Sequence, residues 1–327
     1  MRRGSVKVLY GYKGASKELR APVMAIGVFD GVHKGHKKVL EGLLDDADKN
    51  GDKVVMTFDP HPRTVLCPGK TAPRIMSLEH RLSIFEKMGM DAVIVLHFTE
   101  AMAEMTAEDF VKNVIRGTGA KKVYVGGNFY FGKGRKGDPY ELIRMGEKYG
   151  IHVKKISPVT SGKKTVSSTW LRQLISSGKI TTAGKLLERP VSVLGTVVKG
   201  DQRGRTLGAP TANIDPHQEV IPPPGVYAVM VDVGGTLRKG VLNVGFKPTF
   251  YGSHLKKREE PHIEVNLMGY KGDLYGTVLE IFFIKRLRSE KRFGSPQALS
   301  AQIQRDTTKA ERILCGTNFS KGFPWRG

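Results

Sequence analysis

Short apolar runs alternate with amphipathic stretches over the first 187 residues. The apolar runs lie at 22–29, 53–59, 91–98 and 121–129, and stretches with apolar positions at helical spacing follow at 35–51, 77–89, 106–119 and 139–150. Continuous apolar runs are typical of buried parallel strands, which crossover helices connect. We therefore predict a Rossmann-like, doubly wound parallel sheet, a fold that binds ligands at the carboxyl ends of its strands.

The pattern changes from about residue 188. Short runs rich in β-branched residues, separated by Gly, Pro, Asn and Asp, lie at 189–200, 225–235, 236–246, 262–270 and 277–288. Such spacing predicts an antiparallel barrel or sandwich. A closing helix is expected over 295–314, with Ser295 as its N-cap and Pro296 in its first position. The expected domains are therefore 1–187 and 188–327.

The charge of the chain is strongly positive. Its 327 residues include 53 Lys and Arg and 31 Asp and Glu, which gives a formal net charge of +22. Such a balance attracts polyanions, including nucleic acid, anionic lipid and phosphorylated small molecules. Because the basic residues are scattered and no aromatic residues are interleaved with them, a generally basic surface is favoured over a nucleic-acid-binding platform.

The cysteines and the apolar content bear on location. Cys67 and Cys315 lie far apart and match no metal or redox spacing, which favours a reducing compartment. We find no apolar run long enough to span a membrane, and the basic N-terminal segment is not followed by the apolar region of a signal peptide. We therefore expect a cytoplasmic protein without a membrane partner.

The segment GVFDGVHKGH (27–36) lies where the first predicted strand meets the first predicted helix. Its glycines let the backbone approach a bulky anion, toward which the helix start directs free N–H groups. Three roles are open for His33 and His36: metal ligands, packed turn residues or phosphate contacts. Further ligands at a characteristic metal spacing are missing. Two histidines in one Gly-rich turn therefore favour phosphate chemistry.

Two features of the second half carry candidate chemistry. In GRTLGAPTANI (204–214), Thr211 and Asn213 offer the hard oxygen atoms that Mg²⁺ prefers. The alternative is a plain β-turn with its Asn in a left-handed conformation. Glu264 lies in an alternating strand and is a candidate base for phosphoryl transfer, whereas the alternative is an acidic side chain that faces water.

These residues carry a family resemblance. Gly-x-Phe-Asp-Gly-x-His-x-Gly-His is similar to the nucleotide-binding turn of the nucleotidylyltransferases, and its Phe-Asp-Gly version resembles the bacterial bifunctional riboflavin kinase/FAD synthetases. Other segments fit that family in order: TFDPHP (57–62), VGGNFYFGKGRKGD (125–138), VSSTWLR (166–172), PTAN (210–213), NVGFKPTF (243–250), IEVNL (263–267) and LRSEKRF (287–293). The resemblance covers nearly the whole chain.

The resemblance implies an FMN adenylyltransferase site in 1–187. His33 and His36 would act on the phosphates. The implied ATP-binding residues are Gly27, Phe29, Asp30, Gly35, His36, Ser167, Ser168, Thr169 and Arg172, and the implied FMN-binding residues are His61, Pro62 and Asn128. An ordinary helix N-cap explains one of the three hydroxyls at 167–169 but not all three together with Arg172. For His61, a structural loop histidine is the alternative.

The resemblance also implies a Greek-key β-barrel with a riboflavin kinase site in 188–327. Glu264 would take the proton from the ribityl 5′-hydroxyl. Thr211 and Asn213 would hold Mg²⁺, and the remaining ATP and flavin contacts would be Gly204, Leu207, Gly208, Pro210 and Arg288. The alternative for Arg288 is a solvated charge at a strand end.

The implied function is bifunctional: ATP-dependent phosphorylation of riboflavin to FMN, followed by adenylylation of FMN to FAD with release of pyrophosphate. Three positions depart from the family pattern: Asn128 replaces Asp, Tyr130 replaces a basic residue and Asn266 replaces His. Asn128 or Asn266 leaves open the alternative of a monofunctional member with one decayed site, and the net charge of +22 leaves open a basic nucleic-acid-binding protein on this scaffold. We expect small-molecule partners (ATP, riboflavin and FMN), no nucleic acid, and a monomer or weak homo-oligomer.

Overall fold

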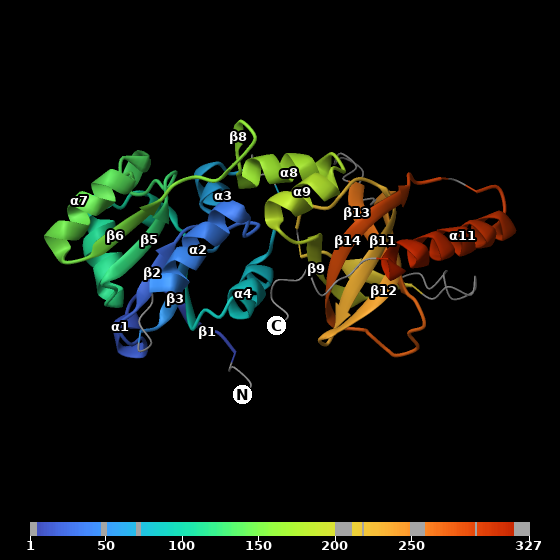
Figure 1. The fold of residues 1–327 in the computed structure, drawn as a ribbon, viewed down its shortest axis with the longest axis horizontal. Helices are drawn as coiled ribbons and strands as arrows, with labels where there is room; N and C mark the ends of the chain where they lie inside the picture. Colours follow the sequence, from blue (N-terminus) through green and yellow to red (C-terminus); the bar gives the residue numbers. More distant parts are fainter. Residues whose placement is uncertain are drawn as a thin grey trace, which may run out of the picture. The chain divides into compact units, whose positions relative to one another are not determined.

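The computed structural model describes residues 5–46, 51–69, 73–199, 211–217, 219–248, 259–291 and 293–316. The chain divides into two compact units. Unit 1 comprises Met1–Pro73 with Leu78–Ser168, and unit 2 comprises Arg74–Ser77 with Thr169–Gly327. Figure 1 traces both units along the chain. The expected boundary between functional domains at 187/188 stays a prediction.

Unit 1 is built on a six-stranded sheet in the order β1-β4-β3-β2-β5-β6, in which every neighbouring pair is parallel. The strands are β1 (Lys7–Tyr10), β2 (Val23–Ile26), β3 (Lys53–Phe58), β4 (Ala92–Leu96), β5 (Lys122–Gly126) and β6 (His152–Ile156). The predicted parallel sheet is confirmed. The chain steps outward from β2 through β3 to β4 and then returns to the other side of β2, so the end of β2 is a topological switch point.

Helices connect the strands of unit 1. They are α1 (Ala15–Glu18), α2 (Lys34–Asp46), α3 (Pro62–Leu66), α4 (Leu78–Lys87), α5 (Glu100–Ala103), α6 (Ala107–Asp109), the π-helix η1 (Phe110–Ile115), the 3₁₀ helices η2 (Arg116–Thr118) and η3 (Lys133–Arg135), and α7 (Pro139–Tyr149). A small antiparallel pair, β7 (Thr160–Ser161) and β8 (Lys164–Thr165), follows β6. The single helix predicted over 106–119 is therefore a succession of three helical types.

Two inner strands of this sheet are buried over their whole length. All residues of β2 and β4 are buried, which explains their uninterrupted apolar sequences. The edge strand β6 has no buried residue, and β1 is partly exposed. These two strands escape the sequence pattern because an edge strand of a sheet need not be apolar on both faces.

Unit 2 contains a closed barrel in the order β10-β13-β12-β11-β14-β9, with antiparallel pairing throughout. Its strands are β9 (Val191–Val198), β10 (Ala212–Asp215), β11 (Gly225–Val233), β12 (Thr236–Pro248), β13 (Glu259–Leu267) and β14 (Val278–Arg288). The predicted antiparallel barrel is confirmed. Closure removes unpaired edges, so the short strand β10 is held from both sides.

The described residues of unit 2 also form the helices α8 (Ser168–Ser176), which begins at the last residue of unit 1, α9 (Ile180–Leu187) and α11 (Pro296–Cys315). Figure 1 shows α11 alongside the barrel, where it contacts β11, β12 and β14. The Ser295 hydroxyl accepts a hydrogen bond from the Ala298 N–H, and Pro296 is the first helical residue. The predicted helix start is therefore confirmed.

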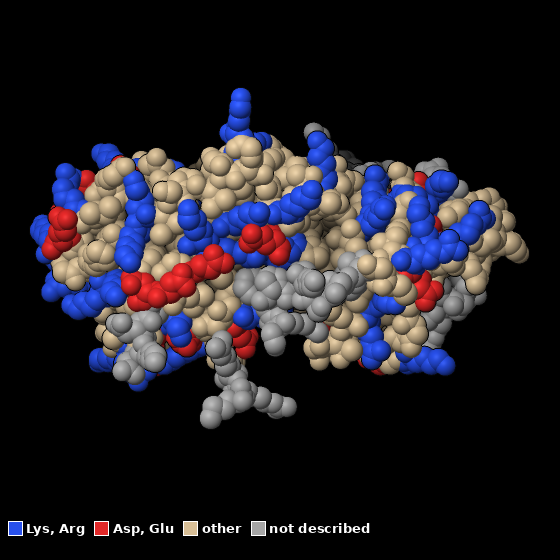
Figure 2. Space-filling view, viewed as in Figure 1, with Lys and Arg blue, Asp and Glu red and all other residues tan. Residues whose placement is uncertain are grey.

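The described helices and the charged surface bear on the expected partners. In the part of the chain that the structure describes, no helix combines the length and the apolar character needed to cross a bilayer. Figure 2 shows Lys and Arg spread over the visible face, with Asp and Glu between them. On that face the positive charge does not form a single continuous patch.

Candidate active sites

The turn between β2 and α2 has an unusual backbone. Phe29 and Val32 have positive φ values of 53° and 38°, and Gly31 lies between them at 89°. Positive φ is uncommon for a residue with a side chain and a clear outlier for a β-branched one. Phe29 and Val32 are both buried, so the surrounding packing holds this conformation. Backbone held in such regions is found disproportionately at ligand-binding sites.

The two histidines of this turn stack on each other. Their ring centroids lie 3.7 Å apart with an interplanar angle of 17°. The His36 backbone N–H donates to His33 Nδ1 at 3.3 Å, which places the proton of a neutral His33 on Nε2. The Phe29 ring meets the His36 ring edge to face, with centroids 5.3 Å apart. The turn therefore holds both imidazoles in fixed orientations.

His36 is kept neutral by its surroundings. Burial lowers the pKa of His36 well below its usual value, and the neighbouring charges of His33 and Arg81 act in the same direction. Its Nδ1 is buried and has no hydrogen-bond partner among the described residues. A buried polar atom without a partner costs about 1–3 kcal/mol, so a partner outside the protein chain is expected to satisfy it.

We expect a histidine NMR titration to show His36 neutral at pH 6, below the ordinary histidine pKa of about 6.5. The unfolded chain binds a proton at His36 more readily than the folded chain does. The free energy of unfolding should therefore be at its full value above about pH 6.5 and decrease as the pH falls below it. Selectively ¹³C-labelled protein gives the protonation state, and the spectrum of His36→Ala assigns the signal. Half-protonation at or above pH 6.5 would contradict the expected burial effect.

Arg81 of α4 clamps the strand ends beneath this turn. Its guanidinium donates to Val28 O at 2.8 Å, to Thr57 Oγ1 at 2.7 Å and to Phe58 O at 3.3 Å, and it lies 3.6 Å from an Asp59 carboxylate oxygen. The side chain is almost fully buried. Arg81 thereby joins the carboxyl ends of β2 and β3. One signal in the sequence could have identified Arg81: its charge lies at the helical spacing of the buried Leu78 and Phe85.

Replacing Arg81 with Met should destabilise unit 1. The substitution removes the hydrogen bonds that the guanidinium donates to Val28 O, Thr57 Oγ1 and Phe58 O, although Thr57 Oγ1 still donates to Val28 O at 3.1 Å. Each lost hydrogen bond typically contributes about 0.5–1.5 kcal/mol to stability. Thermal unfolding followed by circular dichroism should show a lower first transition. Arg144→Met on α7 is the matched control because Arg144 is exposed. Equal melting of both variants and the wild type would show that the clamp does not stabilise the strand ends.

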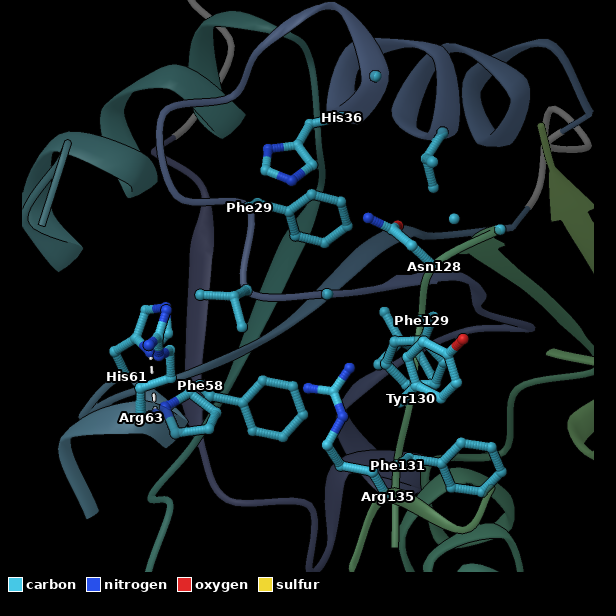
Figure 3. A pocket seen from close by; sticks show the side chains of 18 of the residues that line it. Phe29, His36, Phe58, His61, Arg63, Asn128, Phe129, Tyr130, Phe131 and Arg135 are labelled. Carbon is cyan, nitrogen blue, oxygen red and sulfur yellow. Dashed lines mark hydrogen bonds between the residues drawn. The ribbon is translucent and has the colours of Figure 1, made fainter. Parts of the chain in front are cut away.

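A cavity of about 540 Å³ opens at the carboxyl ends of the strands of unit 1. Predicted residues on its wall are Gly27, Phe29, His33, Gly35, His36, His61, Pro62 and Asn128. Figure 3 shows several of them, with His36 beside Phe29 and His61 beside Arg63. The His61 ring accepts a hydrogen bond from the Arg63 N–H at 3.1 Å and so caps α3. His61 thus has a structural role and also lines the cavity.

Much of the cavity wall was not predicted as part of the site. Six aromatic residues belong to this part of the wall: Phe58, Phe98, Phe110, Phe129, Tyr130 and Phe131. The Arg135 guanidinium lies 4.7 Å from the centre of the Tyr130 ring, and both residues line the cavity. A cation is therefore present at this wall although Tyr130 itself is uncharged. An apolar cavity with a few cations suits a planar aromatic ligand that carries phosphate.

A hydrogen bond from Ser168 joins the hydroxyl-rich segment to the turn. Ser168 Oγ donates to the Asp30 backbone oxygen at 2.8 Å, and the preceding Thr165 and Val166 line the cavity. Asp30 itself is buried and is not part of the cavity wall. Thr169 and Arg172 belong to unit 2. Their predicted triphosphate contacts stay predictions, as does that of Ser167.

The barrel of unit 2 brings three polar residues into one row. Glu264 of β13 pairs directly with Asn213 of β10 on one side and with Asn243 of β12 on the other. Ile263 and Val265 are buried at the alternate positions, so this row faces away from them. Asn213 lies in a strand and has no positive φ. The alternative of a left-handed turn residue was therefore wrong, because pairing with β9 and β13 extends this segment.

Asn213 resembles His36 in one respect. The side chain is buried, and its Oδ1 has no hydrogen-bond partner among the described residues. Glu264 is partly exposed and accepts a hydrogen bond from His262 Nε2 at 2.8 Å. An unpaired amide oxygen next to a carboxylate is a donor set suited to a hard cation. Across the described ranges, no group of three or more His, Cys, Asp or Glu is arranged to hold a metal.

Comparison with known families accounts for both halves of the chain. The FAD synthetase family matches residues 15–170, and the riboflavin kinase family matches residues 187–314. The chain is 35% identical over 314 residues to a relative from Bacillus subtilis described as a bifunctional riboflavin kinase/FMN adenylyltransferase, with coverage of 95% of this chain and 98% of the relative. The chain belongs to the bifunctional riboflavin kinase/FMN adenylyltransferase family.

Other members and a solved structure agree. A relative from Escherichia coli K12 with the same description is 36% identical over 295 residues, covering 89% of this chain and 92% of the relative. A structure from Streptococcus pneumoniae, described as a macrolide-efflux protein, shares the fold with a TM-score of 0.79 and 30% identity, covering 94% of this chain and 99% of that chain. The described two-unit architecture is thus the one found in a structure that matches almost end to end.

Some of the predicted kinase-site residues cannot be placed in the barrel. Gly204, Leu207, Gly208 and Pro210 lie outside the described residues. Arg288 donates through Nε to the buried Asp306 of α11 at 2.8 Å, and its side chain is only 17% exposed. The alternative of a solvated strand-end charge was therefore wrong, because α11 supplies an ion-pair partner. A flavin contact by Arg288 stays a prediction.

Proposed function

We propose that this family member carries out two consecutive reactions. Unit 2 transfers the γ-phosphoryl group of ATP to the ribityl 5′-hydroxyl of riboflavin, which gives FMN. Unit 1 then lets the FMN phosphate attack the α-phosphorus of a second ATP, which gives FAD and pyrophosphate. One observation supports the proposal above all: in each unit, polar residues gather around a buried atom that has no hydrogen-bond partner within the described ranges, Nδ1 of His36 and Oδ1 of Asn213.

Adenylyl transfer in unit 1 works by positioning and electrostatics. The reaction needs no covalent enzyme intermediate, because FMN is itself the nucleophile. The Gly27–Gly35 turn admits the triphosphate to the strand ends, and the stacked His33 and His36 donate to its oxygen atoms as charge develops at phosphorus. The aromatic wall holds the flavin and excludes water. We assign ATP contacts to Ser167, Ser168, Thr169 and Arg172 and flavin contacts to His61, Pro62 and Asn128.

Phosphoryl transfer in unit 2 needs a base on the nucleophile. Glu264 accepts the proton of the ribityl 5′-hydroxyl while the oxygen attacks the γ-phosphorus. We assign Mg²⁺ to the oxygen atoms of Thr211 and Asn213, and the buried, unpaired Oδ1 of Asn213 fits that assignment. When bound, Mg²⁺ neutralises charge on the phosphates of ATP.

One incubation tests the proposal. Purified protein is mixed with riboflavin, ATP and Mg²⁺, and the flavins are separated by chromatography. We expect FMN to appear first and FAD to follow. FMN alone would indicate a decayed adenylyltransferase site, and conversion of added FMN without riboflavin turnover would indicate a decayed kinase site. No flavin turnover, with steeply salt-dependent binding to DNA or RNA, would favour the nucleic-acid-binding alternative.

A further inference from the structure

His262 and Glu264 lie on the same face of β13. Residues two apart on a strand share a face, and Ile263 between them is buried on the other. His262 Nε2 lies 2.8 Å from Glu264 Oε1. Because a carboxylate only accepts hydrogen bonds, Nε2 carries the proton of this bond. Both side chains are partly shielded, with exposed fractions of 22% for His262 and 33% for Glu264.

The Glu264 carboxylate has no other hydrogen-bond donor in the part of the chain that the structure describes. Asn213 and Asn243 flank it across the ladder, yet neither amide is bonded to it. A glutamate on a strand is otherwise free to rotate about its last two side-chain bonds. The hydrogen bond from His262 therefore sets the direction of the carboxylate, and it occupies Oε1 while Oε2 stays available.

We propose that His262 is a positioning residue for the kinase reaction. It holds Glu264 Oε1 so that Oε2 accepts the proton of the substrate hydroxyl, and it does not itself contact the reacting atoms. This inference rests on the proposed kinase function of unit 2. Loss of the hydrogen bond should misplace the base, and a misplacement of about 1 Å is enough to cost up to about 100-fold in rate.

Two amide substitutions of His262 form a matched test. The side-chain NH₂ of Gln lies about as far from the backbone as histidine Nε2, whereas that of Asn is one methylene shorter. In the full-length protein, His262→Asn should lower kcat for riboflavin phosphorylation about 10- to 100-fold with little change in the KM values. His262→Gln should restore most of the rate. FMN adenylylation, measured in the same samples, should equal that of the wild type for both variants.

A double variant separates positioning from a general structural role. If His262 acts only through Glu264, His262→Asn should add no further loss in a Glu264→Gln background. Equal rates for the Asn and Gln variants, a change confined to KM, or additive losses in the double variant would each overturn the inference. Failure of the wild type to phosphorylate riboflavin would instead overturn the proposed function, so the two failures are distinguishable.

Discussion

Glu264→Gln should reduce riboflavin phosphorylation to a small residual rate and leave FMN adenylylation intact. The substitution keeps the size of the side chain, and its amide oxygen still accepts the hydrogen bond from His262. It removes the negative charge and the basic oxygen that takes up the proton of the hydroxyl. Loss of a general base usually costs about 10²- to 10⁴-fold in rate. Separation of flavins after incubation with riboflavin and ATP, and independently with FMN and ATP, measures both activities.

The control for this variant is Glu311→Gln. Glu311 is an exposed carboxylate on α11, so its substitution makes the same change of charge in the same unit. We expect that control to phosphorylate riboflavin at the wild-type rate. Loss of both activities in Glu264→Gln would contradict the assignment of separate sites to the two units. Retention of kinase activity would show that another group accepts the proton.

The architecture of unit 1 was predictable because strands that are buried on both faces have continuous apolar sequences. The strands β2 and β4 have no solvent-facing side, so their apolar runs mark them directly. The turn after β2 then falls at the ligand-binding edge by topology alone. Arg81 shows where such reasoning ends. The helical spacing places its charge on the buried face, but the acceptors Val28 O and Phe58 O come from strands about 25 to 50 residues away.

The row in the barrel was only partly predictable. Strand alternation places His262, Glu264 and Asn266 on one face of β13, so the phase of the strand was enough to bring a histidine beside the base. The family pattern places a histidine at position 266, where this chain has Asn266, and makes no prediction for position 262 on the other side of Glu264. β10 was missed as a strand because four residues become a strand only through pairing with β9 and β13. Pairing partners at such separations are not encoded in local periodicity.

His36→Ala should have the reverse effect of Glu264→Gln and make FMN the terminal product. The substitution removes the imidazole that lines the cavity and stacks on His33. Removing one preorganised donor to developing charge typically costs about 10²- to 10³-fold in kcat. Riboflavin phosphorylation should proceed at the wild-type rate because unit 2 holds that site. The time course of FMN and FAD from riboflavin, together with kcat for added FMN, gives the result.

The matched control is His152→Ala, which removes an exposed imidazole from the edge strand β6 of the same unit. That variant should make FAD normally, so a loss confined to His36→Ala is not a general effect of losing a histidine. The split between kinetic constants is also informative. A fall in kcat would show that His36 stabilises the transition state. A rise in the KM for ATP alone would show that His36 only contributes to ATP binding. Formation of FAD by His36→Ala at the wild-type rate would show that the strained turn, with its stacked histidines, serves the fold and not adenylyl transfer.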